Sequence, residues 1–205
     1  MRSAMRYMIL ALLICGWQQA AAIAQESAES CAGGKLTSPV KIEVFSDFQC
    51  PSCREFYLNT MRQVFTNYAD AGKVCVVYRE FPLTNIHPHA FEAARYGHAA
   101  LGLGPRQWSL VADALFSAQD KWSKDGQIEP VLSSALNAED LGKLKEKMKD
   151  PSIEAAITRD TEMARARQVT ATPTFFVTGK GKTQKIVGVV QYPILSRFLD
   201  SLLTP

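Results

Sequence analysis

Few cysteines, little net charge and no long hydrophobic run set the first limits on this protein. Five cysteines among 205 residues are too few for a disulfide scaffold that replaces a hydrophobic core. The 23 basic and 20 acidic residues nearly balance, which argues against the strongly basic surface of a nucleic-acid-binding protein. With 47% hydrophobic residues, the composition is that of a globular protein with a substantial core. We expect no nucleic-acid partner.

The N-terminus has the features of a targeting segment. An apolar run at 7–17 follows two arginines and precedes Ala22-Ile23-Ala24, whose small residues are typical of a signal peptidase site. A membrane-spanning helix needs about 20 apolar residues, so this run is too short to be one. We predict that 1–24 form a signal peptide and that the chain is exported to the periplasm or another cell-envelope space, with no stable membrane insertion after cleavage. A buried N-terminal helix is the alternative.

The next part of the chain predicts a strand-helix-strand unit. Residues 25–38 are small and polar, so we expect a flexible leader and an ordered chain from about Pro39. Apolar and polar residues alternate at first over 40–48, as in a strand, and 73–81 begins with a β-branched run typical of a strand buried on both faces. An amphipathic helix between them is long enough to join parallel strands.

The remainder of the chain predicts a helical block followed by a hairpin. Helices are expected at 89–101, 106–118, 129–136, 138–149 and 151–168. Asn137 with Asp140, and Asp150 with Pro151, are signals of a helix start. After this block we predict strands at 174–178 and 184–190, joined by a turn at 179–182, and a closing helix at 192–203.

Cys50-Pro51-Ser52-Cys53 stands between the first predicted strand and its helix. The N–H groups and the dipole at a helix start stabilise a thiolate, so we expect a lowered pKa for Cys50. The two-residue spacer brings both sulfurs within bonding reach, so Cys53 can attack a mixed disulfide formed at Cys50. This pattern favours redox chemistry. Half of a zinc site and a structural disulfide are the alternatives.

We predict no metal site and no soluble cofactor. A zinc site would need a second ligand pair at zinc-finger spacing, and the sequence has none. His87, His89 and His98 are the three histidines of the chain. Pro88 keeps the first two from sharing a helical face, so the polarity of a loop and a helix start explains them.

Two segments carry a resemblance to a known family. Residues 44–53 read VFSDFQCPSC and residues 171–175 read ATPTF. In this order, in an exported chain, they resemble the DsbA-like branch of the thioredoxin superfamily. The resemblance implies an α/β, thioredoxin-like fold built from 39–83 and 169–205, with an inserted helical subdomain at 84–168.

The resemblance also implies roles for individual residues. Cys50 resembles the exposed nucleophile and Cys53 the buried resolving thiol, while Pro173 resembles a cis-proline whose loop faces the disulfide. The main chain at Thr172 would pair with an extended substrate segment in strand fashion, and the spacer residues Pro51 and Ser52 would also face the substrate.

The spacer departs from one pattern of the family. Strongly oxidising relatives carry Pro-His between the cysteines, whereas this chain carries Pro51-Ser52. A serine hydroxyl can donate a hydrogen bond but brings no charge. We therefore expect a disulfide that oxidises less strongly than theirs.

Two acidic residues near the cysteines have two interpretations each. Glu43 resembles the buried acid that relays protons to the resolving cysteine in relatives, but it could equally be an outward polar residue of an alternating strand. Asp47 could act electrostatically at the site, whereas a turn-forming or capping aspartate is the commoner case.

Cys31 and Cys75 allow three interpretations. Cys75 could be a small buried apolar residue, or the two could form a disulfide in an oxidising compartment. Alternatively, Cys31 could reach the active site and exchange with it.

The function predicted from these observations is disulfide donation to unfolded or reduced substrate proteins through Cys50 and Cys53. The resemblance implies reoxidation by a quinone-linked membrane partner of the DsbB or vitamin K epoxide reductase (VKOR) type. An isomerase or reductase is the second hypothesis, and a non-catalytic module that delivers a metal through the CxxC pair is the third. The substrates, the direction of electron flow and the oligomeric state stay open.

Overall fold

The computed structural model describes residues 29–204, so the predicted signal peptide and the first residues of the predicted leader lie outside the described residues. The described part has a four-stranded sheet in the order β2-β1-β3-β4. Its strands are β1 (Val40–Ser46), β2 (Val74–Glu80), β3 (Thr174–Gly179) and β4 (Lys182–Val187). β1 is parallel to β2 and antiparallel to β3, and β3 is antiparallel to β4. The predicted α/β, thioredoxin-like fold is confirmed.

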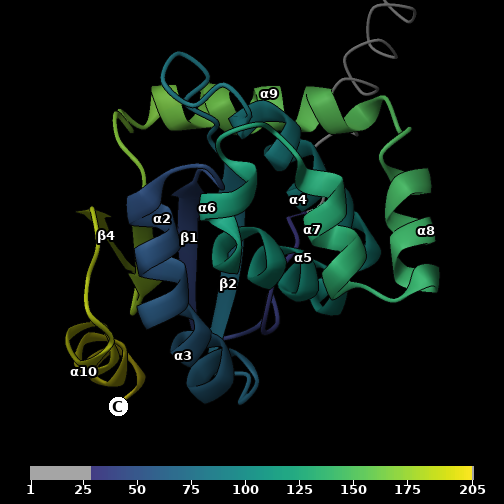
Figure 1. Cartoon of the computed structure of the whole chain (residues 1–205). Helices are drawn as coiled ribbons and strands as arrows, with labels where there is room; N and C mark the ends of the chain where they lie inside the picture. Colours follow the sequence, from purple (N-terminus) through teal and green to yellow (C-terminus); the bar gives the residue numbers. More distant parts are fainter. Residues whose placement is uncertain (1–28, 205) are drawn as a thin grey trace, which may run out of the picture.

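The helix after β1 begins at the residue that follows Cys50. Its segments are α2 (Pro51–Phe56), η1 (Tyr57–Met61), α3 (Arg62–Val64) and η2 (Phe65–Ala69). A proline suits the first helical position because its φ is already helical and its missing N–H would have no partner there. Figure 1 shows this helix lying across β1, with its start near α6.

The helical insertion joins β2 to β3. Its helices are α4 (Ala90–Leu103), α5 (Pro105–Ser117), α6 (Gln119–Trp122), α7 (Ile128–Ala135), α8 (Ala138–Lys147) and α9 (Ser152–Ala166). The predicted start at Asn137 is confirmed, because its side chain accepts from the Asp140 N–H at 2.8 Å. The start predicted at Asp150 and Pro151 is one residue too early, because Pro151 is the N-cap and α9 begins at Ser152, whose N–H donates to the Asp150 carboxylate at 2.9 Å. The short helix α6 was not predicted.

The position of β4 corrects the sequence prediction. The strand was expected at 184–190 but ends at Val187. Lys180 and Gly181 both have left-handed φ angles, 50° and 71°, so they form a two-residue turn and β4 starts at Lys182. Val189 and Val190 then pack against the core outside the strand, before the closing helix α10 (Tyr192–Leu203).

The predicted flexible leader is wrong for its described end. Cys31 and Cys75 form a disulfide, and Ala32 is buried. The Ala32 N–H donates to the Val76 carbonyl at 2.7 Å, and the Val76 N–H donates to the Gly33 carbonyl at 2.9 Å. These links fix the segment along β2 despite its small, polar composition. They also mean that Cys31 does not lie at the active site.

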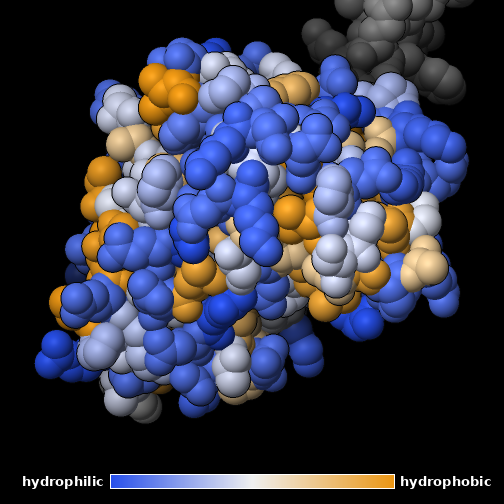
Figure 2. Space-filling model, in the orientation of Figure 1, coloured by the Kyte–Doolittle hydropathy of each residue, from blue (hydrophilic) through white to orange (hydrophobic). Residues whose placement is uncertain are grey.

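Two apolar layers cover the sheet. The larger contains Cys50, Cys53 and the buried residues of the helix after β1, together with residues of the insertion and α10. The smaller lies on the other face and includes Phe45, Val169 and Phe176. The side of the molecule seen in Figure 2 is mainly hydrophilic, with separate groups of hydrophobic residues. Within the described residues, no helix is long and apolar enough to cross a membrane.

Candidate active site

A tight turn carries the chain from β1 into the cysteine motif. The Cys50 N–H donates to the Asp47 carbonyl at 3.1 Å, and the Gln49 N–H donates to the Asp47 carboxylate at 2.8 Å. The other carboxylate oxygen accepts from the Leu83 N–H at 2.9 Å and lies 2.7 Å from Nδ1 of His87. Asp47 therefore forms the turn, as the commoner of its two interpretations predicts, and it also holds the loop after β2 against the turn.

Cys50 lies at the N-cap of α2 and has a strongly perturbed thiol. A hydrogen bond from the Cys53 side chain contributes most to lowering the pKa of Cys50 to about 5, and burial opposes it. The N–H groups of Cys53 and Ser52 lower this pKa further. Because the ordinary value is 9.0, Cys50 is a thiolate at neutral pH in the reduced protein.

Cys53 has the opposite environment. Its side chain is 1% exposed, and burial, followed by the neighbouring Cys50, raises its pKa well above the ordinary value. The Asp47 N–H donates to its sulfur at 3.5 Å. Cys50 is 8% exposed, so the expected exposed nucleophile has most of its surface covered, though less completely than Cys53. The pair combines a thiolate with a buried, protonated thiol, which is the arrangement needed for exchange followed by resolution.

The loop before β3 faces Cys50. The Thr172–Pro173 peptide bond is cis, as the family resemblance implies. The Cys50 sulfur lies 3.4 Å from the Thr172 carbonyl oxygen, to which the thiol donates when it is protonated. The buried Thr172 hydroxyl has no hydrogen-bond partner among the described residues. Pro51 and Ser52 are exposed, so the turn is open to solvent beside this loop.

Glu43 is not brought to the cysteines. It lies on β1 with both carboxylate oxygens accepting from arginines, one from Arg79 at 2.8 Å and one from Arg167. Burial raises its pKa, but Arg167 and Arg79 together outweigh burial and lower it. The alternative of an outward residue is wrong, because Glu43 is 5% exposed and lies in a charged cluster. The proton-relay role stays a prediction, to which these arginine contacts add no support.

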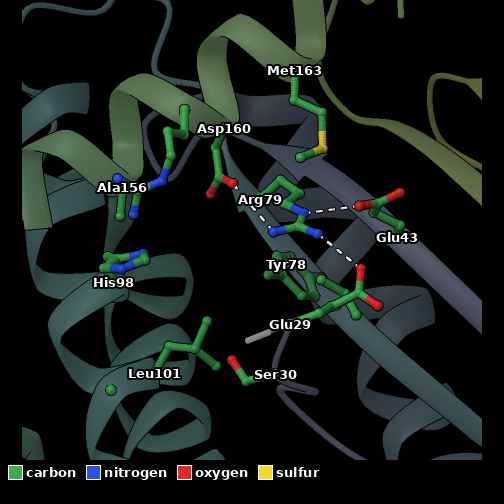
Figure 3. Close-up of a pocket in the computed structure, with 13 residues that line it drawn as sticks. Glu29, Ser30, Glu43, Tyr78, Arg79, His98, Leu101, Ala156, Asp160 and Met163 are labelled. Atoms are coloured by element: carbon green, nitrogen blue, oxygen red, sulfur yellow. Dashed lines mark hydrogen bonds and ion pairs between the residues drawn. The ribbon is translucent and has the colours of Figure 1, made fainter. Parts of the chain in front are cut away.

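This charged cluster lines a cavity of about 690 Å³. Figure 3 shows Arg79 directed toward Glu43, Glu29 and Asp160, with His98 across the cavity. The Arg79 guanidinium donates to Glu29 at 2.8 Å and to Asp160 at 3.4 Å. These contacts tie the end of the leader, β1, β2 and α9 together, so the cluster supports the sheet rather than the cysteine chemistry.

Three polar residues near the cysteine turn were missed by sequence reasoning. Gln119 donates to the carbonyls of Phe48 and Cys50, and Gln49 donates to the Ser123 carbonyl. Glu80, at the end of β2, is 5% exposed. A Cβ added at Gly97 of α4 would lie 2.8 Å from Oε1 of Glu80. The glycine therefore leaves room for the Glu80 side chain. Their positions depend on contacts distant in sequence, and no local spacing indicates them.

The described residues contain no group of three or more His, Cys, Asp or Glu side chains that could hold a metal ion. The chemistry that the site offers is that of two neighbouring thiols with opposite pKa shifts.

Comparison with known proteins decides the family. A family model described as Thioredoxin matches residues 26–189, most of the chain. This chain belongs to the thioredoxin family. Its Cys-x-x-Cys pair is Cys50 and Cys53.

Individual relatives of this thioredoxin-family protein differ in length. It is 29% identical over 147 residues to "Na(+)/H(+) antiporter NhaA 1" of Mycolicibacterium gilvum, covering 72% of this chain but only 23% of the antiporter. It is 25% identical over 150 residues to "Probable disulfide bond formation protein D" of Bacillus cereus, covering 71% of this chain and 68% of that protein. The crystal structure of alpha-DsbA1 from Wolbachia pipientis has a TM-score of 0.71 at 21% identity, covering 86% of this chain and 92% of that one.

Proposed function

We propose that this protein is a DsbA-like thiol-disulfide oxidoreductase and that it donates its Cys50–Cys53 disulfide to reduced or unfolded substrate proteins. The observation that carries the proposal is the pKa of Cys50, lowered to about 5. A stabilised thiolate favours the reduced form of the enzyme, and this makes its disulfide a better oxidant. Because the spacer lacks the histidine of the strongly oxidising relatives, we expect a potential between those of DsbA and thioredoxin.

The reaction starts when a substrate thiolate attacks the Cys50 sulfur of the oxidised enzyme. The Cys50–Cys53 bond breaks, a mixed disulfide forms at Cys50, and the Cys53 sulfur leaves with the electron pair and takes up a proton. A second substrate thiolate then attacks the substrate sulfur of the mixed disulfide and releases Cys50 as a thiolate. Two electrons pass from the substrate dithiol, which becomes a disulfide, to the enzyme, which becomes a dithiol.

The surroundings of Cys50 favour an extended, unfolded substrate. In the proposed complex, the main chain at Thr172 pairs with the substrate chain, an interaction that tolerates many sequences. Val187 is directly paired with Thr174, one residue beyond Pro173, and its side chain is 60% exposed. An apolar side chain there suits segments that a folded substrate would bury. Pro51 and Ser52 form the opposite side of this surface.

Turnover requires a partner that reoxidises the dithiol. We propose export by the predicted signal peptide at 1–24 to the periplasm or cell-envelope space, and reoxidation there by a quinone-linked membrane protein of the DsbB or VKOR type. One similar structure is described as a periplasmic thioredoxin-like protein, from Salmonella enterica. This description supports the location.

The reduction potential of the Cys50–Cys53 pair tests the proposal. The protein is equilibrated with glutathione buffers and its thiols are counted, with Cys50→Ser/Cys53→Ser as a blank that keeps the Cys31–Cys75 disulfide. We expect a potential between those of DsbA, about −120 mV, and thioredoxin, about −270 mV, and formation of one disulfide in reduced ribonuclease A per oxidised enzyme. A potential at the thioredoxin value, without disulfide formation in the ribonuclease, would overturn donation in favour of reduction or isomerisation.

A further inference from the structure

We propose that Gln119 is a positioning residue through which the helical insertion sets the geometry of the Cys50-Pro51-Ser52-Cys53 turn, and with it the oxidising strength of the disulfide. Gln119 is the first residue of α6 and lies 69 positions after Cys50 in the sequence. It contacts neither sulfur by hydrogen bonding. Its effect passes through the main chain of the turn.

Both amide protons of Gln119 are directed at this main chain. Nε2 donates to the Phe48 carbonyl at 2.7 Å and to the Cys50 carbonyl at 3.0 Å. The side chain is 3% exposed, so water does not compete strongly for these bonds. The two carbonyls flank Gln49 and Cys50, and a single rigid amide group therefore fixes the chain on both sides of the nucleophile.

Gln49 makes the reciprocal connection. Its Nε2 donates to the Ser123 carbonyl, just after α6, at 2.8 Å, and its Oε1 accepts from the His89 N–H at 2.8 Å. Arg54 on α2 and Asp120 on α6 add an ion pair of 2.7 Å at the surface. The turn is thus held against the insertion from both directions, by two buried amide side chains and one exposed ion pair.

The orientation of the turn matters because main-chain N–H groups stabilise the thiolate. The N–H groups of Ser52 and Cys53 lower the pKa of Cys50. Pro51, which directly follows Cys50, has no N–H to contribute. The Cys50 carbonyl accepts from Gln119 and also from the Arg54 N–H at 3.1 Å. Without Gln119, the first turn of α2 keeps only its own helical bond at this carbonyl, and the donors lose their fixed alignment with the sulfur.

Gln119→Met tests the inference because methionine fills a similar volume without donors. We expect the pKa of Cys50, followed by thiolate absorbance at 240 nm, to rise by about one unit. The equilibrium with glutathione should shift about tenfold toward the oxidised enzyme, which corresponds to about 30 mV. The matched control is Gln107→Met in α5, whose amide donates to Asp140 within the insertion at 3.0 Å and makes no hydrogen bond to the turn.

A second variant keeps the test decisive if methionine prevents folding. Gln119→Asn retains the amide but is one methylene shorter, so it cannot reach both carbonyls, and it should shift the same two quantities in the same direction. A merely structural role would lower the melting temperature while leaving the pKa of Cys50 within about 0.3 units, and the glutathione equilibrium within twofold, of the unaltered protein. That result would overturn the proposal. Neither outcome depends on whether the enzyme donates or accepts disulfides in the cell.

Discussion

Arg167 lies over the ring of Phe176, with its guanidinium carbon 3.5 Å from the ring centroid. The same guanidinium donates to Glu43, and Lys185 donates to the carbonyls of Arg167 and Gln168. The chain between α9 and β3 is therefore attached to β1, β3 and β4 shortly before it reaches Thr172. These attachments lie on the face of the sheet that carries the smaller apolar layer. They support the loop at Thr172, which faces Cys50.

Arg167→Met should lower the free energy of unfolding at pH 7 by about 1–3 kcal/mol. Glu43 is 6% exposed at its side chain and would keep only Arg79 as a partner. Because arginine neighbours lower the folded-state pKa of Glu43, its contribution is present above the unfolded value and is lost as the pH falls through the folded one. Urea denaturation at pH 7 and at about pH 3 should therefore show the difference shrinking in acid. Arg165→Met, at an exposed residue near the end of α9, is the control, and an equal loss in both variants would contradict this account.

Glu80→Gln should stabilise the protein at neutral pH by about 1–3 kcal/mol. Burial, and then the carboxylates of Asp160 and Asp47, raise the pKa of Glu80 well above 4.5. A raised folded-state pKa means that the unfolded chain ionises first, so this residue contributes stability below pH 4.5 that is lost as the pH rises. The melting temperatures of the variant and the unaltered protein should converge toward pH 4.5 and separate toward pH 8. Finding the variant less stable at pH 8, with no change for exposed Glu162→Gln, would refute the prediction.

Cys53→Ala should raise the pKa of Cys50 above its value of about 5. The hydrogen bond from Cys53 is the largest cause of the lowered pKa, and alanine has no donor. A rise of about one unit corresponds to a tenfold loss of thiolate stability. The measurement is the thiolate absorbance between pH 3 and 9, with Cys50→Ala as the blank. An unchanged titration would mean that the main-chain N–H groups alone stabilise the thiolate.

Removal of the second disulfide should affect stability and not redox chemistry. Cys31 and Cys75 are 44 residues apart, and a loop of that size is worth about 3–4 kcal/mol in the unfolded-chain entropy model. Cys31→Ser/Cys75→Ser should lose about this much in urea denaturation. The glutathione equilibrium of Cys50 and Cys53 should stay within twofold of the unaltered protein, and a larger shift would show that the leader influences the active site.

The elements that could be predicted are those whose signal lies in consecutive residues. The parallel pair β1 and β2, the cysteine turn and the Asn137 cap each follow from local periodicity or spacing. β4 begins two residues earlier than predicted, directly after the turn at Lys180 and Gly181. Lys182 and Thr183 are polar, so only their pairing with β3 identifies them as part of a strand. The arginine partners of Glu43 could not be predicted, because alternation tells which residues share a face but not which arginines lie across it.

The active-site residues divide in the same way, into those that local sequence predicts and those that it does not. Cys50, Cys53 and the loop at Pro173 could be found from motifs in chain order. Gln119 and Glu80 could not, because their partners are separated from them by dozens of residues and only the packed insertion brings them together. A buried glutamine has no sequence signature of its own, since the same residue type is common on helix surfaces.

The two margins of the sheet differ in how they meet other polypeptides. β2 is one edge strand of the sheet. Its Val76 N–H and C=O groups are already paired with Gly33 and Ala32, so they are not free to bind another strand. β4 is mostly exposed and carries Lys182 and Lys185, and charged lysines on an outer strand discourage pairing with foreign strands. Under the proposed function, the protein meets unfolded segments that are able to extend its sheet into an aggregate. The segment around Cys31, held to β2 by the disulfide, and the lysines on β4 make such an aggregate harder to start.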